Sequence, residues 1–208
     1  MARSNPRIGV TGSAVQIRQV SSGSNIAGIQ LRVDYSRVPA PDPYYVADYA
    51  RLAVHGAAVQ VIFGKLEGLG GTRLRNKLEV DIPAYSFMSQ WIASTAFFDG
   101  LQESFEKGLF PKYDQPSNID EYTEKVQTLH SNNCLITSGG SECCIDFYYL
   151  SPRDIRNSLE QHNETQLEGL VRVIVDSSIL IWLARSFDQI SDQISSFVQK
   201  ADDGLKDF

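Results

Sequence analysis

The chain has few of the residues that build metal sites, disulfides and membrane anchors. Its 208 residues include three cysteines, three histidines and two methionines. Cys143 and Cys144 are adjacent, Cys134 stands apart, and no cysteine spacing matches a zinc site. We therefore expect reduced thiols in a cytoplasmic protein that holds no metal ion and no cofactor.

Long apolar runs and an excess of positive charge are also missing. The longest apolar stretch, residues 171–184, contains Arg172 and Asp176 and is shorter than the roughly 20 residues that cross a bilayer. No apolar stretch typical of a secretory signal follows the first residues. Lys and Arg number 19 against 25 Asp and Glu, which argues against nucleic-acid binding through bulk charge. We expect neither a membrane nor nucleic acid as a partner.

The chain does have globular proportions and repeated strand patterns. Apolar residues make up 42% and charged residues 21% of the sequence. Apolar residues alternate with polar ones over 49–54 and 59–63, on either side of His55-Gly56, which predicts a hairpin. A second hairpin is predicted around Ser138–Ser141, and further strands over 78–82 and 171–175. These patterns predict an α+β fold with antiparallel sheets.

Two long amphipathic helices are the other clear feature. The first is expected from about Tyr85 to Lys107, and the second from Ser177 or Ser178 to about Lys200. The two helices carry continuous apolar stripes, made of Phe87, Trp91, Phe98, Leu101 and Phe105 in the first and Leu180, Leu183, Phe187, Ile190, Ile194 and Phe197 in the second. Both apolar faces are wider than one contact requires, and the face of the second helix also includes Trp182. The helices can pack on each other within the chain, or they can contact an oligomer partner or a client.

The two halves match one another. An offset of 84 aligns the hairpins without a gap, so that Val61 falls on Ile145. After a longer loop the offset becomes 93, and Val80 falls on Val173. We read this as two degenerate repeats, each an antiparallel meander followed by a long helix. The alternative is that two unrelated halves of this class look alike because both alternate.

The repeats set the expected domain organisation. Residues 1–27, rich in Ser, Gly and Asn, are expected to form an N-terminal arm. The first repeat covers 28–108, a linker with two prolines covers 109–125, and the second repeat covers 126–208.

A meander followed by a long helix is similar to the SecB-like fold of protein-export chaperones. The stretches Tyr45–Tyr49, Val61–Gly64 and Leu78–Pro83 also resemble a short bacterial domain family of uncharacterised function. Asp48 stands where that family usually has Asn, and Tyr148 stands in the second half where it has Gly. The SecB-like resemblance implies oligomers with helices at the interface and apolar grooves that hold unfolded clients.

Several residues are candidates for chemical sites. Cys143, Cys144 and His130 are the only cysteine–histidine grouping, but alternation places the two cysteines on opposite strand faces, which favours core positions over a nucleophile. His55 and His162 are scattered and do not indicate a metal site. The Gly68–Thr72 loop lacks the Lys-Ser/Thr of a phosphate loop. Arg73, Arg75 and Lys77 share one strand face, either as an anion-binding strip or as a solvated edge.

The sequence therefore predicts a non-enzymatic protein-binding module. It would be chaperone-like or an adaptor, a homo-oligomer of bacterial or phage origin, and would hold partner segments in apolar grooves. The residues expected to contact the partner are Phe87, Trp91, Phe98, Trp182, Phe187 and Ile194. A structural subunit of a larger assembly is the main alternative, and an enzyme with an unrecognised site is a further one.

Overall fold

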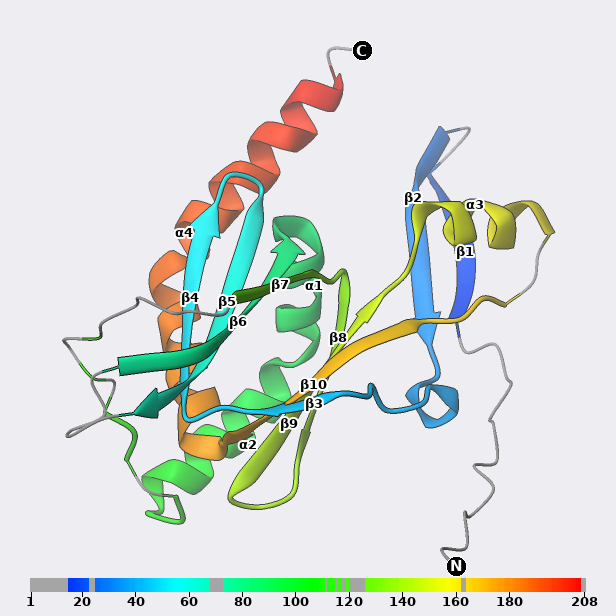
Figure 1. Cartoon of the computed structure of the whole chain (residues 1–208). Coiled ribbons are helices and arrows are strands. Elements are labelled where there is room, and N and C mark those ends of the chain that lie inside the picture. Colours follow the sequence, from blue (N-terminus) through cyan, green and yellow to red (C-terminus); the bar gives the residue numbers. More distant parts are fainter. Residues whose placement is uncertain are drawn as a thin grey trace, which may run out of the picture. The chain divides into compact units, whose positions relative to one another are not determined.

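The protein is a mixed α+β chain, as predicted, and separates into two compact units. The structure, a computed structural model, describes residues 15–22, 25–67, 73–110, 112–114, 116, 119, 126–161 and 164–206 (Figure 1). The first unit combines Met1–Ala40 with Leu150–Gly169, and the second combines Pro41–Tyr149 with Leu170–Phe208. Both predicted meander–helix repeats thus contribute most of their residues to the second unit.

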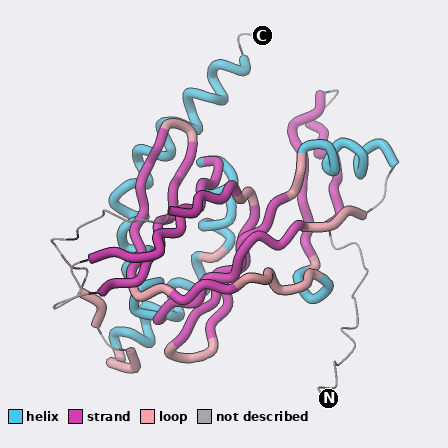
Figure 2. The backbone as a smooth tube through the Cα atoms, viewed as in Figure 1, coloured by secondary structure: helices cyan, strands magenta, loops and turns pink. Residues whose placement is uncertain are grey.

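The first unit is built on a hairpin where the sequence indicated an arm. Strands β1 (Val15–Ser22) and β2 (Asn25–Val33) pair antiparallel, and helix α3 (Pro152–Gln161) packs against β1 (Figure 2). A short 3-10 helix, η1 (Tyr35–Arg37), follows β2. The hairpin extends the strand expected over 29–33 on its N-terminal side, so the described part of residues 1–27 is mainly strand.

The second unit contains two four-stranded sheets. One has the order β4 (Tyr49–His55), β5 (Ala58–Glu67), β6 (Arg73–Pro83), β7 (Val126–His130). The other has the order β3 (Tyr44–Val46), β10 (Glu168–Asp176), β9 (Glu142–Tyr149), β8 (Asn133–Ser138). The hairpins β4–β5 and β8–β9 are antiparallel, whereas the edge pairs β3–β10 and β6–β7 are parallel.

Two corners join these sheets through neighbouring amides. The Ala47 N–H donates to Ile174 of β10 at 2.9 Å, and the next amide, Asp48, donates to Gly64 of β5 at 3.1 Å. The second corner repeats this pattern, with Ser131 donating to Asp81 at 2.9 Å and Asn132 to Tyr148 at 3.2 Å. Successive amides of an extended chain point to opposite sides. Each half therefore lends its first short strand to the sheet of the other half.

The pairings of the two halves follow the two sequence offsets. Leu52 lies opposite Val61 in the first hairpin, and Ile136 lies opposite Ile145 in the second. The parallel pairs obey the same rule, because β3 residue 45 lies opposite residue 173 and β7 residue 129 lies opposite residue 80. The amides that follow β6 and β10 also agree, because Ala84 donates to the Ala57 carbonyl and Ser177 donates to the Ser141 carbonyl. Residues of the first short strand and of the hairpin are related by an offset of 84. Residues of β6 and of the following helix start are related to those of β10 and α4 by an offset of 93.

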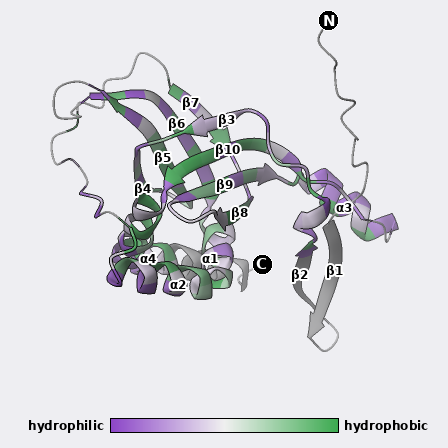
Figure 3. Ribbon diagram, turned by 90° about the horizontal axis from the view of Figure 1, so that it is seen from below, coloured by the Kyte–Doolittle hydropathy of each residue, from purple (hydrophilic) through white to green (hydrophobic). Residues whose placement is uncertain are grey.

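Helices α1 (Ala84–Ala93), α2 (Thr95–Glu106) and α4 (Ser177–Lys206) form one layer on one face of these strands (Figure 3). The core lies between the layers, where Phe63 meets Phe147 edge to face at 5.9 Å. The first predicted helix is broken into α1 and α2 at Ser94, whose hydroxyl donates to the Gln90 carbonyl at 2.9 Å. A serine hydroxyl that bonds the preceding turn competes with the helical backbone.

Some predictions lie outside the described residues. They are residues 1–14 of the expected N-terminal arm, the Gly68–Thr72 loop, His162 and the side chain of Phe197. The linker expected over 109–125 is described only in part. There, Tyr113 packs edge to face on Trp182 of α4 at 6.1 Å.

Candidate functional site

The six residues expected to contact a partner all lie on the helix layer of the second unit. Phe87 and Trp91 come from α1, Phe98 from α2, and Trp182, Phe187 and Ile194 from α4. The two tryptophans are half-buried, and the other four side chains are buried. The four buried side chains therefore pack within the chain, as the first alternative expected. Only the two tryptophans have enough exposed surface to contact a partner.

Trp91 is the centre of an aromatic cluster that fixes the three helices together. Its ring lies 4.4 Å from Phe98 of α2, 4.5 Å from Phe187 of α4 and 5.4 Å from Phe87 of its own helix. Close aromatic pairs of this kind contribute about 0.5–1.5 kcal/mol each beyond their burial. The cluster holds the Trp91 ring in one orientation and leaves one part of it at the surface.

That part of Trp91 lies in a groove between α2 and α4. The groove has a volume of about 340 Å³, at the small end of the roughly 300–1,000 Å³ typical of ligand sites. Trp91, Phe98, Ile181 and Ala184 supply its apolar lining. Its size suits one or two anchoring side chains rather than a long segment.

The polar lining of the groove contains two acids, one arginine and two neutral side chains. Asp99 of α2 and Asp188 of α4 are exposed, and no ion pair joins either carboxylate to another described residue. Arg185 also lines the groove, but its guanidinium donates to Gln102 Oε1 at 3.2 Å and lies 5.1 Å from the Phe105 ring centroid. Arg185 is thus held on α2 but keeps its charge, so the rim has two acids against one base, and the two carboxylates remain open to a basic partner.

A second hollow lies beneath Trp91, between the helices and the sheets. It is a cavity of about 40 Å³, too small for a ligand, and is almost wholly apolar. Its lining draws on positions that the two offsets relate: Leu52 with Ile136, Val61 with Ile145, Phe87 with Leu180, and Gln90 with Leu183. The cavity therefore lies where the two halves meet.

Gln90 is the one amide side chain among the described residues that line the cavity, and it bridges α1 to strand β8. Its Nε2 donates to the carbonyl of Asn132 at 3.1 Å and to that of Ser86 at 2.9 Å. Its Oε1 accepts from the backbone amide of Cys134. Gln90 thus hydrogen-bonds to backbone groups at the start of β8, as a neighbouring strand would. Sequence reasoning missed this residue, whose signal is a lone amide near the apolar stripe.

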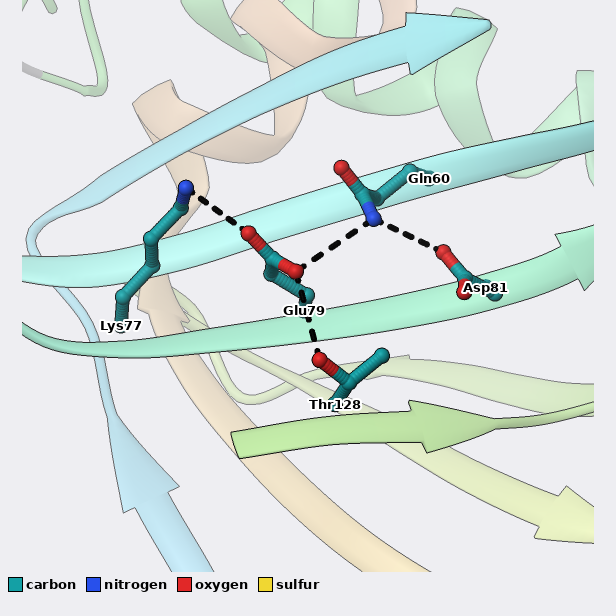
Figure 4. A network of polar contacts seen from close by, with 5 residues as sticks. All are labelled: Gln60, Lys77, Glu79, Asp81 and Thr128. Atoms are coloured by element: carbon teal, nitrogen blue, oxygen red, sulfur yellow. Dashed lines mark hydrogen bonds and ion pairs between the residues drawn. The ribbon is translucent and has the colours of Figure 1, made fainter. Parts of the chain in front are cut away.

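The face of the sheet away from the helices carries an ionisable network (Figure 4). Gln60 Nε2 donates to Asp81 at 2.9 Å and more distantly to Glu79 at 3.5 Å. Glu79 also pairs with Lys77 at 2.7 Å and accepts from Thr128 at 3.3 Å. Neither described hollow contains these side chains. Lys77 balances the charge of Glu79, and the neutral Gln60 donates to both carboxylates, which stand at spacing two.

The other sheet carries a bidentate ion pair that the sequence did not predict. Arg172 Nε and Nη2 donate to the two oxygens of Asp146 at 2.6 and 2.7 Å, and the Asp146 carboxylate is buried. Tyr148 OH also contacts Asp146, at 3.4 Å. Hydrogen bonding to Asp146 raises the pKa of Arg172 further above its usual range. The signal is one Asp and one Arg, each within an apolar strand.

The cysteines do not form a reactive site among the described residues. Burial raises the pKa of the Cys134 thiol to about 12, so it stays protonated near neutral pH and is a poor nucleophile. Cys143 is buried with its Sγ 3.2 Å from the Ser177 hydroxyl, and Cys144 faces the other side of the strand. His130 lies 3.6 Å from Asp81 instead. The structure brings none of these thiols to a described histidine.

The basic strip on β6 is matched by acids. Arg75 pairs with Glu67 of β5 at 2.9 Å, and Lys77 pairs with Glu79. Strand β6 lies between β5 and β7, and Lys77 pairs with Val126 of β7, so the strip is not the solvated edge that the sequence suggested. The acidic partners of Arg75 and Lys77 also argue against an anion site. Among the described residues no group of His, Cys, Asp and Glu could hold a metal ion.

Comparisons of the chain with protein-family models, with curated proteins and with solved structures give no match. No helix in the described part of the chain combines the length and the apolar character that crossing a membrane requires.

Proposed function

We propose that this chain is a non-enzymatic protein-binding module, an adaptor or chaperone-like protein, that binds a partner segment in the α2–α4 groove. The observation that carries the proposal is the position of Trp91, held by three aromatic neighbours and half-buried in a groove that also carries Asp99 and Asp188. Tryptophan in such a setting is typical of binding hot spots.

The groove also defines the kind of segment that it fits. Its lining accepts an apolar side chain, and the exposed carboxylates of Asp99 and Asp188 attract Lys or Arg beside it. A small, rigidly lined groove favours a selective adaptor over a holdase, because broad client binders use adaptable, Met-rich surfaces. The chain has only two methionines.

The repeats are part of the same proposal. We infer that the two halves descend from one meander–helix unit by tandem duplication and now act as a built-in pseudo-dimer. The matched strand registers and the matched corner hydrogen bonds support this origin. A SecB-like relationship stays a prediction.

Peptide titration tests the groove. In a Trp182→Phe background, the fluorescence of Trp91 is followed while two peptides of equal length are added, one with Leu-Phe flanked by Lys and Arg and one with Leu-Phe flanked by Glu. We expect only the basic peptide to change the emission. Reversing both rim charges, Asp99→Lys with Asp188→Lys, should weaken binding about tenfold, since exposed charge pairs contribute about 0.2–1 kcal/mol each.

Asp192→Lys is the matched control, because Asp192 is an exposed acid one turn after Asp188 and does not line the groove. Its binding should stay within twofold of the unmodified protein. The adaptor form is wrong if neither peptide alters the emission, or if the doubly reversed variant binds as before. Suppressed aggregation of unrelated unfolded proteins, insensitive to the rim charges, would instead support the chaperone form.

A structural subunit is the second candidate, and one observation favours it. The outer face of α1 exposes Tyr85 and Ile92, which are not covered by any described part of the chain.

A further inference from the structure

Helix α1 presents an exposed face without charge. Tyr85 and Ile92 lie two turns apart on this face and are 70% and 67% exposed, with the half-buried Met88 and the exposed Ser89 between them. No charged residue occurs from Pro83 to Phe98. The solvent face of a surface helix normally carries charged or polar side chains. An aromatic, a Met and an aliphatic residue without charge are instead typical of the centre of a protein interface.

Part of the corresponding face of α4 is covered, although Arg185, the counterpart of Ile92, is exposed. The offset of 93 relates Met88 to Ile181, which is 3% exposed in the α2–α4 groove. It also relates Ser89 to Trp182, which packs on Tyr113 from the segment after α2. After α1, the chain turns at Ser94 and covers α4 rather than α1. Helix α4 continues unbroken to Lys206, so the described chain has no second α2 to cover α1.

We propose that the α1 face, made of Tyr85, Met88, Ser89 and Ile92, is the interface of a homodimer. A two-fold dimer brings the same patch of both copies together, so the patch must be complementary to itself. A face that carries charge of one sign repels its own copy, whereas this face has none. Electrostatics therefore favours a second copy over a strongly charged partner.

The helix geometry defines the contacts of this dimer. Tyr85 and Ile92 are separated by about 10 Å along the helix axis, at 1.5 Å per residue. In an antiparallel α1–α1 pair, Tyr85 of one copy faces Ile92 of the other, and the axis passes near Met88 and Ser89. The small Ser89 side chain lets the two helices approach closely at this point. A ten-residue helix supplies only part of the roughly 800 Å² per partner of a stable interface. We therefore expect a reversible dimer with a dissociation constant in the micromolar range.

Sedimentation velocity of the full chain over a dilution series tests the proposal. We expect a dimer that dissociates on dilution, and an increase of at least tenfold in the dissociation constant for Ile92→Lys. Leu109→Lys is a matched control, since Leu109 is also 67% exposed but lies after α2. This control should dimerise as the unmodified protein does. Because both positions are exposed, the two variants are expected to fold.

A second experiment gives a positive signal. Ser89→Cys should form a disulfide-linked dimer under mild oxidation, because Ser89 lies near the two-fold axis. Gln193→Cys, an exposed position on α4, should not. The proposal is overturned if the protein is a monomer at every soluble concentration, or if its dimer is unaffected by Ile92→Lys. Neither result bears on the α2–α4 groove, which none of these substitutions alters.

Discussion

Gln90→Leu is the substitution that tests most directly how the two halves are joined. Leucine fits this helical position, because Leu183 lines the cavity from the corresponding site on α4. The variant nevertheless removes two hydrogen bonds of Gln90, to the Asn132 carbonyl just before β8 and to the Cys134 amide within it. The bulk of the side chain changes little, so the effect reports on the polar contacts.

The magnitude follows from the groups that lose their partners. An unsatisfied buried polar group costs about 1–3 kcal/mol. Both groups are only part-buried, so each is assigned about 1.5 kcal/mol. Offset by about 1 kcal/mol from burial of the leucine, they predict a net loss of about 2 kcal/mol. For a chain of this size, each kcal/mol lowers the Tm by about 2–4 °C. We expect the Tm to fall by about 4–8 °C.

Thermal unfolding followed by far-ultraviolet circular dichroism measures this change, and hydrogen exchange locates it. The Cys134 amide should lose protection in the variant. Gln189→Leu, at an exposed position on α4, is the control and should change the Tm by less than about 1 °C. If Gln90→Leu behaves like this control, then the amide does not stabilise β8 and the reasoning is refuted.

Two other predictions concern pH and packing. Burial raises the pKa of Cys134 and of Tyr113 to about 12, from ordinary values of 9.0 and 10.0. The folded state therefore holds these protons more tightly than the unfolded state does. Its stability is complete below about pH 9 and declines as the pH rises toward 12. In an alkaline unfolding titration, Cys134→Ala should shift the onset of this decline to higher pH. A methyl group at Gly64 would overlap the side chain of the buried Leu74, so Gly64→Ala should destabilise by about 1–3 kcal/mol in urea unfolding. Gly100→Ala, which meets open space in α2, should stabilise by up to about 1 kcal/mol, and equal effects at the two glycines would contradict the packing argument.

Local patterns predicted the second unit well where pairing is local. The hairpin around His55-Gly56 has the expected strands, and Gly56 has a φ of 56°, in the left-handed region that glycine favours. Helix α4 carries the predicted stripe from Leu180 to Ile194. The break at Ser94 was missed, because apolar spacing is continuous across it and the hydroxyl contact with Gln90 leaves no mark on the periodicity.

The reciprocal strand pairing could not be read from the sequence. Strand β3 has only three residues, too few to show a period, and its partner β10 lies far along the chain. The groove was likewise only half predicted. Trp91 and Phe98 were identified from the stripe, whereas Asp99 and Asp188 became part of the site only when α2 packed against α4.

The two corners also affect the order in which the chain can fold during synthesis. Strand β3 pairs with Arg172–Ile174, which belong to β10, the last strand in chain order among the described residues. Likewise, the sheet that begins with β4 lacks an edge strand until β7 has been made. Pairings between distant segments fold slowly, because a long loop must close first. On the ribosome, the first half would wait with an open sheet edge until the second half emerged. The nascent chain with this open edge is therefore the form most prone to aggregation and to capture by chaperones.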